Sequence, residues 1–310
     1  MNRVQGRILV IRGGAIGDFI LTLPVLAALR QQFPQARLEV LGYPHIARLA
    51  LTNGLAADVR CIESGTLAGF FARNGRLTAD LADFFSDFDV IISYLYDPDL
   101  IFEANVKRCS EAQFISGPHR PDETEMLHAT EVFLKPLESL AIFEADTIPR
   151  LAVTKAFETG TTTGRWLALH PGSGSETKNW PESKWAEFLA YLIKSTTFHL
   201  LIVGGEAERE RVERLVKPLP QTRLKLMQSL PLTELAQWMA ACIGFVGHDS
   251  GISHLAAAVS LPSLILWGDT VESIWRPRNQ QLVVLSDSHG LENLSVPVVI
   301  NHFEKLFELR

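Results

Sequence analysis

The feature that most constrains the fold of this chain is a regular alternation of short apolar runs with segments of helical periodicity. Residues 7–12 and 37–41 are two such runs, and each precedes a segment with helical spacing. Alternation of this kind is typical of a parallel sheet with helices on both faces. It stops at residues 154–164, which are rich in Thr and Gly, and then resumes. The sequence therefore predicts an α/β protein with two doubly wound, Rossmann-like domains, residues 1–155 and 165–310, that face a central cleft.

Several elements of this alternation can be assigned to residue ranges. In the first domain we expect a helix at residues 19–33 and a closing helix at residues 125–140. In the second domain we expect strands at residues 166–170, 200–204, 224–227, 264–267 and 282–285, and helices at residues 181–194, 206–217 and 232–241. We expect a terminal helix from about residue 298, and this helix could pack against the first domain.

Composition and charge exclude several classes of protein. The chain is 47% hydrophobic and 21% charged, which is typical of a globular protein. Its net charge of −6 argues against a nucleic-acid partner, because a protein that tracks phosphates normally has a basic face. Cys61, Cys109 and Cys242 are too far apart for a zinc site or a disulfide framework, which favours a reducing compartment. No apolar run has the length of a membrane span or signal peptide, so we expect a cytoplasmic protein.

The first candidate for an anion site is the strand-to-helix junction at Asp249, Ser250 and Gly251. An apolar run at residues 244–246 is expected to be a buried strand, and a helix is expected to begin near Ser250 or Gly251. Asp249 and Ser250 are good N-cap residues, and Gly251 lets a ligand approach the backbone. The free N–H groups and the dipole of such a helix start favour a phosphate. The alternative is a well-capped turn that binds nothing.

A second candidate is the loop that follows the strand at residues 166–170. It contains Ser173, Gly174 and Lys178, and a helix is expected to begin at Pro181. Small residues followed by a lysine suit a loop around a pyrophosphate. The loop is not a Walker A motif, because the pattern G-x-x-x-x-G-K-[ST] is absent. The alternative is a surface loop with a solvated lysine.

Two further residues are candidates for ligand contacts. Glu206 follows two glycines after a strand and is a candidate for a ribose or base contact, although a simple helix start is an equal alternative. His254 lies one turn into the helix that Ser250 opens, where it is either a phosphate contact or a buried, hydrogen-bonded histidine. No histidine spacing in the chain is typical of a metal site, so no metal is expected.

The first strand-to-helix turn, residues 12–18, partly matches the dinucleotide fingerprint. Arg12 stands where the first glycine of that motif belongs, and the second strand ends without a clear acidic residue, so an NAD site is disfavoured. Asp18 follows the glycines and is a candidate general base, because an ordinary aspartate is ionised at neutral pH. The alternative is an acid that stabilises the helix dipole by about 0.3–1 kcal/mol.

Aromatic residues gather in the stretch from residue 67 to residue 85. They are either an amphipathic patch that meets a membrane surface or part of the core, and we favour the core.

Taken together and in this order, these stretches resemble the glycosyltransferase family 9 heptosyltransferases of lipopolysaccharide inner-core assembly. The matching stretches are Gly17-Asp18 with Thr22-Leu23-Pro24-Val25-Leu26, the segment from His170 to Glu182, Gly204-Gly205-Glu206, the stretch from Asp249 to Ala258, and Trp267-Gly268-Asp269-Thr270. They cover nearly the whole second domain and the start of the first.

The resemblance implies a GT-B fold and inverting transfer of a heptose-like sugar from an ADP-sugar to a lipid-linked acceptor. It implies no metal and no cofactor besides the donor substrate. By position, Asp18 is similar to the base that deprotonates the acceptor hydroxyl. Lys178 and the backbone of Ser250 and Gly251 are similar to the groups that bind the departing diphosphate. The other donor-site positions implied are Ser173, Gly174, Asp249 and His254, with Glu206 near the nucleoside.

The resemblance fails at residues 91–98, where the family usually has an Asp-Leu-Gln-Gly-like stretch. This stretch lies in the acceptor half, so the acceptor and the linkage are not predicted. Two other interpretations stay open: a GT-B-fold nucleotide-sugar epimerase, which has no separate acceptor, and a non-catalytic nucleotide-sugar-binding protein. A lipid-linked acceptor is compatible with peripheral contact with the cytoplasmic face of the inner membrane.

Overall fold

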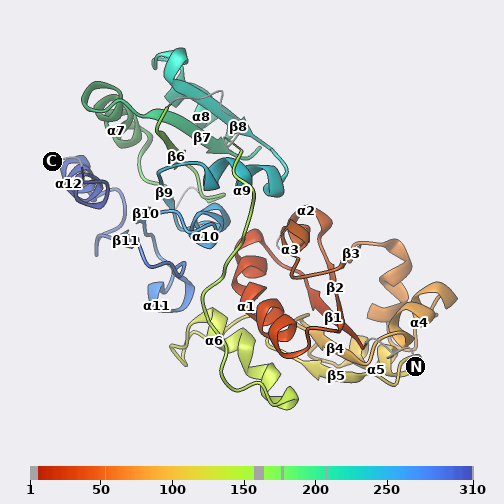
Figure 1. The fold of residues 1–310 in the computed structure, drawn as a ribbon. Helices are drawn as coiled ribbons and strands as arrows, with labels where there is room; N and C mark the ends of the chain where they lie inside the picture. The colour runs from red at the N-terminus through yellow and green to blue at the C-terminus, as the bar shows by residue number, and fades with distance from the viewer. Residues whose placement is uncertain (1–5, 53, 157–163, 176–177, 207, 309–310) are drawn as a thin grey trace. The chain divides into compact units, whose positions relative to one another are not determined.

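The computed structural model describes residues 6–308 except residues 53, 157–163, 176–177 and 207. The chain divides into two compact units, residues 1–149 and 150–310. Each unit is built on a parallel sheet with helices on both faces (Figure 1), which confirms the predicted α/β class. The expected linker lies largely outside the described residues, and the domain limits at residues 155 and 165 stay a prediction.

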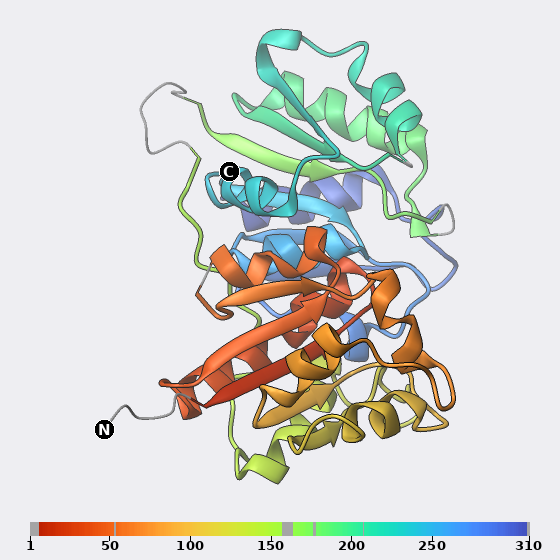
Figure 2. The same ribbon diagram turned by 90° about the vertical axis from the view of Figure 1, so that its right-hand side faces the viewer.

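Unit 1 contains a sheet of five parallel strands in the order β3-β2-β1-β4-β5 (Figures 1 and 2). Its elements are β1 (Arg7–Arg12), α1 (Ile16–Gln32), β2 (Arg37–Gly42), α2 (Pro44–Ala47), α3 (Leu49–Thr52), β3 (Asp58–Cys61), the 3₁₀ helix η1 (Gly65–Phe71), α4 (Ala79–Ser86), β4 (Val90–Ser93), α5 (Ile101–Lys107), β5 (Gln113–Ser116), α6 (Ala129–Leu134) and the 3₁₀ helix η2 (Lys135–Leu140). Because β1 pairs with both β2 and β4, the loops after these strands meet at one edge of the sheet.

The core of unit 1 has one layer on each face of this sheet. Leu9 and Ile11 of β1 pack in a cluster with aromatic residues of η1, α4 and α5, namely Phe70, Phe85 and Phe102. Successive strand residues point to opposite faces, so Ile8 and Val10 lie on the face of α1, which packs against α6. Phe70 and Phe85 are fully buried, so this part of the aromatic stretch belongs to the core, as favoured from the sequence.

Unit 2 contains a sheet of six parallel strands in the order β11-β10-β9-β6-β7-β8. Its elements are β6 (Trp166–His170), α7 (Glu182–Ser195), β7 (His199–Gly204), α8 (Arg209–Val216), the 3₁₀ helix η4 (Gln221–Arg223), β8 (Leu224–Gln228), α9 (Leu232–Ala240), β9 (Gly244–His248), α10 (Gly251–Ala258), β10 (Ser263–Leu266), α11 (Glu272–Trp275), β11 (Leu282–Leu285) and α12 (Val296–Leu306). The loops after β6, β9 and β10 are neighbours because these three strands are adjacent.

The core of unit 2 is richest on the face covered by α7, α8 and α12 (Figure 1). Trp180, Trp185 and Phe188 are fully buried there, and Phe303 of α12 joins them. Helices α9 and α10 pack against each other on the other face. Helix α12 therefore contributes to the core of its own unit, and its expected packing on the first domain stays a prediction.

The structure differs from the predicted elements mainly at helix ends. The helix expected at residues 125–140 begins at Ala129, because the side chain of His128 accepts a backbone hydrogen bond and caps the first turn. From Lys135 onward it continues as the tighter η2, which has a proline in its first turn. Helix α8 begins at Arg209 and not at residue 206.

Candidate active site

Asp18 lies in the first turn of α1, directly after the glycine turn that ends β1. Its Oδ2 atom accepts a hydrogen bond of 2.9 Å from the backbone N–H of Ala15. Gly14 has a φ of +98°, and a Cβ atom at this position would lie 2.7 Å from Asp18 Oδ2, so the turn requires a glycine. The side chain of Asp18 is 29% exposed. The carboxylate is thus both fixed in orientation and accessible.

Arg12, the last residue of β1, holds the other oxygen of this carboxylate. One of its Nη atoms lies 3.6 Å from Asp18 Oδ1, and the other donates a 2.9 Å hydrogen bond to the carbonyl of His119. The guanidinium is 2% exposed and lies 4.4 Å from the ring centroid of Phe133. Burial lowers the pKa of Arg12, and the charge of Asp18 and the nearby Tyr94 oppose this effect. From the sequence, Arg12 is only a mismatch to the dinucleotide fingerprint, and its contact with Asp18 was not predicted.

In unit 2, the structure brings together Lys178 and Asp249, which are predicted on separate stretches. Lys178 Nζ donates a 2.7 Å hydrogen bond to Asp249 Oδ2, and the Thr270 hydroxyl donates one of 2.6 Å to the same oxygen. The Asp249 side chain is 9% exposed, whereas that of Lys178 is 30% exposed. The ammonium group is therefore held in place and still accessible to an anion.

The helix start predicted near Ser250 lies directly beside this ion pair. Ser250 is the N-cap of α10, and its side chain accepts a hydrogen bond from the backbone of Ser253. Gly251 is the first helical residue. The first N–H groups of an α-helix have no partners within the helix, and together with the dipole they favour an anion. Lys178 and the start of α10 thus form one corner at the carboxyl ends of β6 and β9, which we call the donor corner, where Asp249 offsets the charge of the ammonium group.

The loop after β6 is tied to the loop after β7 by Glu208, a residue not singled out from the sequence. Glu208 Oε1 accepts the N–H of Gly174 at 2.9 Å, and its Oε2 accepts the N–H of Gly205 at 2.8 Å. A Cβ atom on Gly172 would lie 2.1 Å from the Glu208 side chain, so the loop requires a glycine there. Glu208 is buried, whereas the predicted Glu206 is exposed. Both acids precede the helix, and the sequence contains no signal that distinguishes them.

The remaining predicted positions lie on the same loops. Ser173 donates a 2.8 Å hydrogen bond to the carbonyl of Ser175, and Gly174 adopts a φ of +74°. Residues 176–177 of this loop lie outside the described residues. His254 is 6% exposed in the first turns of α10.

Two buried histidines lie close to this corner. Burial lowers the pKa of His170, and it lowers the pKa of His248 to about 3, so both are neutral near pH 7.

Among the residues that the structure describes, no group of three or more His, Cys, Asp or Glu side chains could hold a metal ion. Within that same part of the chain, no helix has the length and apolar character needed to cross a membrane.

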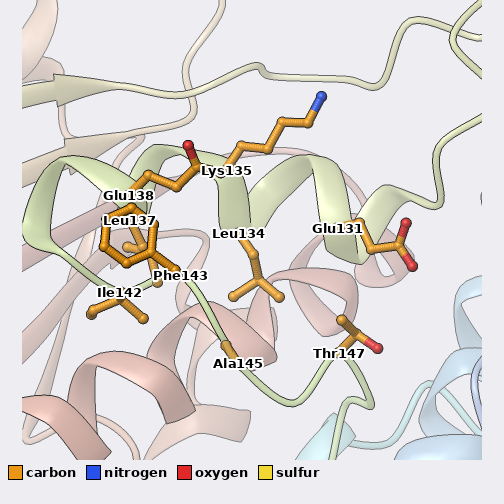
Figure 3. Close-up of a pocket in the computed structure, with 9 residues that line it drawn as sticks. All are labelled: Glu131, Leu134, Lys135, Leu137, Glu138, Ile142, Phe143, Ala145 and Thr147. Atoms are coloured by element: carbon orange, nitrogen blue, oxygen red, sulfur yellow. The ribbon is translucent and has the colours of Figure 1, made fainter.

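A separate open pocket of about 170 Å³ lies on the surface of unit 1 (Figure 3). Its lining combines apolar side chains with Glu131, Lys135 and Glu138 from α6 and η2. Phe143 at this pocket is 75% exposed. None of the predicted site residues lines this pocket.

Comparison with known proteins gives a family and a fold. The profile of glycosyltransferase family 9 (heptosyltransferase) matches residues 139–295. The lipopolysaccharide heptosyltransferase 1 of Pseudomonas aeruginosa is 34% identical over 105 residues, which are 34% of this chain and 29% of that protein. The lipopolysaccharide heptosyltransferase 1 of Escherichia coli K12 is 27% identical over 179 residues, which are 57% of this chain and 54% of that protein. The matched stretches therefore span well under two thirds of these curated relatives.

The fold is shared with a solved structure of E. coli heptosyltransferase WaaC with ADP. The TM-score is 0.73 at 21% identity, and the likeness covers 97% of this chain and 99% of that chain. This likeness agrees with the GT-B fold that the sequence motifs imply. Because the family profile matches just over half of the 310 residues, this chain belongs to glycosyltransferase family 9, the heptosyltransferase family.

Proposed function

We propose that this chain is an inverting glycosyltransferase that moves a heptose-like sugar from an ADP-sugar to a lipopolysaccharide-type acceptor. Membership of family 9 supports the reaction class. The relatives are named as lipopolysaccharide heptosyltransferases, and the similar solved structure contains ADP, which supports this donor and this acceptor class.

The observation that carries the proposal is the donor corner of unit 2, where an ammonium group and the start of a helix lie together. Lys178 Nζ lies 2.7 Å from Asp249 Oδ2, next to the start of α10. A diphosphate that leaves a sugar gains negative charge, and a fixed ammonium group and helix N–H donors stabilise that charge without reorganisation. In this proposal Lys178 and α10 supply the positive charge that a metal ion supplies in other enzymes. Ser173, Gly174, Glu206 and His254 remain proposed contacts to the donor.

Asp18 is the proposed general base of unit 1. Its carboxylate is oriented by Ala15 and Arg12, and it is accessible. A base that removes the proton of the acceptor hydroxyl allows this oxygen to attack the anomeric carbon while ADP departs from the opposite side. This single displacement inverts the anomeric configuration. We further propose that the enzyme works in the cytoplasm, at the face of the membrane where a lipid-linked acceptor is available.

The experiment that tests this function is an assay of ADP-heptose turnover with heptose-deficient lipopolysaccharide, combined with calorimetric titration of ADP. Asp18→Asn keeps the shape of the site and removes the base, so we expect kcat to fall roughly 10²- to 10⁴-fold with ADP affinity unchanged. Lys178→Ala removes a charged donor, so we expect ADP to bind roughly 10- to 100-fold more weakly.

Matched controls are available in the same chain. Asp80→Asn changes another acid in the first turn of a helix, α4, and Lys194→Ala changes an exposed lysine at the end of α7. Both should leave turnover and ADP affinity unchanged. Wild-type turnover in Asp18→Asn would remove Asp18 from the mechanism. Conversion of the donor to an epimeric nucleotide sugar without an acceptor would favour the epimerase alternative, and ADP-sugar binding without turnover on any acceptor would favour the binding-protein alternative. Retention of the anomeric configuration would exclude a single displacement.

A further inference from the structure

A buried histidine joins both ends of the loop that carries Lys178. We define the donor loop as the described residues 171–175 and 178–180, between β6 and α7. His248, the last residue of β9, has no exposed surface. Its Nδ1 atom lies 3.2 Å from the carbonyl oxygen of Gly172 near the start of the loop. Its Nε2 atom lies 2.9 Å from the backbone N of Trp180 at the end of the loop and 3.2 Å from the indole N of Trp185.

These partners define the protonation state of the ring. Both groups that face Nε2 are N–H donors, so Nε2 must be an unprotonated acceptor. Nδ1 then carries the hydrogen and donates it to the carbonyl of Gly172. Burial lowers the pKa of His248 to about 3, which is consistent with this neutral tautomer across the neutral pH range. No other common side chain offers an acceptor and a donor at this separation in one rigid ring.

The neighbouring residue adds a third tie to the same loop. Asp249 follows His248 directly and accepts the hydrogen bond from Lys178 Nζ. The dipeptide His248-Asp249 therefore contacts the donor loop near its start, at Lys178 and at its end. The same dipeptide precedes Ser250, which caps α10. The donor loop and the helix start thus take their relative placement from one short segment.

We propose that His248 is the positioning residue of the donor loop, and that it holds Lys178 and the start of α10 ready to bind the diphosphate of a nucleotide sugar. This inference rests on the function proposed above and extends it. Any buried imidazole needs hydrogen-bond partners, so the presence of such bonds does not by itself indicate a role. What distinguishes His248 is where its partners lie: Gly172 and Trp180 are near the two ends of the donor loop, and the third partner, Trp185, is in α7 directly after the loop.

The test uses ADP as the probe and the full chain. His248→Phe keeps a ring of similar size and removes both nitrogen atoms, so we expect the dissociation constant of ADP to rise about tenfold or more. His248→Gln places an amide oxygen near the position of Nε2 and should restore part of the affinity. His248→Asn places its amide near the position of Nδ1 and should restore the contact with Gly172 alone.

A double-mutant cycle distinguishes positioning from general destabilisation. If His248 acts through Lys178, then His248→Phe should weaken ADP binding much less in a Lys178→Ala background than in the wild type. His128→Phe is the control, because it replaces another buried histidine, at the start of α6 in unit 1, and should leave ADP affinity unchanged. Circular dichroism and thermal melting report which variants fold, and the Gln and Asn variants keep the test usable if the Phe variant does not.

The outcomes separate this inference from the proposed function. If the wild type binds ADP and His248→Phe binds it equally well, the role of His248 is overturned and the glycosyltransferase assignment stays intact. Additive effects of the two substitutions in the cycle have the same meaning. A wild-type chain that binds no ADP would overturn the donor assignment and, with it, this role of His248. Non-additive loss of affinity with rescue by Gln would establish the positioning role.

Discussion

Among single residues, Arg12 has the most unusual environment in the candidate site. A guanidinium that is 2% exposed loses its hydration, and only part of that loss is compensated by Asp18 at 3.6 Å and the carbonyl of His119 at 2.9 Å. Its Nε atom is buried without a hydrogen-bond partner among the described residues. An ion pair with a partly exposed partner is a weak source of stability, because water can solvate the Asp18 carboxylate, which is 29% exposed, when the guanidinium is absent. The arrangement is better explained by the orientation of Asp18 than by the stability of unit 1.

This explanation predicts that activity and stability respond differently to Arg12→Met. We expect the melting temperature to change by only a few degrees, because Met fills a similar volume beside Phe133 and water can solvate the partly exposed Asp18 carboxylate. If Asp18 is the base proposed above, we expect kcat to fall roughly 10- to 100-fold, because a small displacement of this carboxylate disrupts the geometry of the proposed proton transfer. Thermal melting and turnover of ADP-heptose measure the two effects. Arg37→Met is the control, because it removes one exposed partner of the buried Glu39, which keeps its ion pair with Arg7. A large loss of stability with normal kcat would make Arg12 a purely structural residue.

Each residue that sequence analysis missed has at least one partner that lies far away in the sequence. Arg12 bonds to a carbonyl 107 residues away, and His248 bonds to one 76 residues away. Glu208 accepts a hydrogen bond from a glycine 34 residues away. Local periodicity contains no information on such contacts. Asp18, Lys178 and Ser250 were identified because each lies beside glycines or helix-start residues, which do leave a local pattern.

At the scale of secondary-structure elements, the predictions were most accurate where the signal was local. Strand β1 has the predicted bounds, and α10 begins at Gly251 with Ser250 as its N-cap. The prediction of one helix at residues 125–140 was wrong at its start and in its last part. The cap formed by His128 and the proline of η2 set these boundaries, and helical periodicity does not contain them. The ends of elements thus depend on side-chain contacts that the periodicity does not contain.

The start of α10 allows a test of whether this element is an anion site or only a well-capped turn. Ser250→Asp keeps an N-cap acceptor, so we expect little change in the melting temperature, whereas Ser250→Ala should cost about 0.5–2 kcal/mol. A carboxylate at this position repels a diphosphate, so Ser250→Asp should weaken ADP binding about tenfold or more. Calorimetric titration and melting curves measure both. Ser295→Asp, at the N-cap of α12, is the matched control. Unchanged ADP affinity in Ser250→Asp would favour the plain capped turn.

At the scale of the whole molecule, unit 2 has a core of its own, and its buried histidines predict that its stability depends on pH. His170 Nδ1 lies 2.9 Å from the carbonyl oxygen of Val203. Because a carbonyl only accepts, this nitrogen carries the hydrogen and donates it. Burial lowers the pKa of both His170 and His248 below the value of about 6.5 for an exposed histidine. Below that pH the unfolded chain binds protons that the folded chain does not bind, so acid favours unfolding.

We therefore expect the free energy of unfolding of unit 2 to be fully retained above about pH 6.5 and to fall as the pH decreases toward the folded-state pKa of His248, about 3. The limiting slope is about 1.4 kcal/mol per pH unit for each histidine. Urea unfolding, followed by tryptophan fluorescence, at several values between about pH 7 and about pH 5 measures this slope before most carboxylates titrate. His248→Gln cannot titrate, so it should reduce the slope by about half if it folds. A stability that is constant over this interval would mean that the two histidines become accessible to protons without unfolding of the unit.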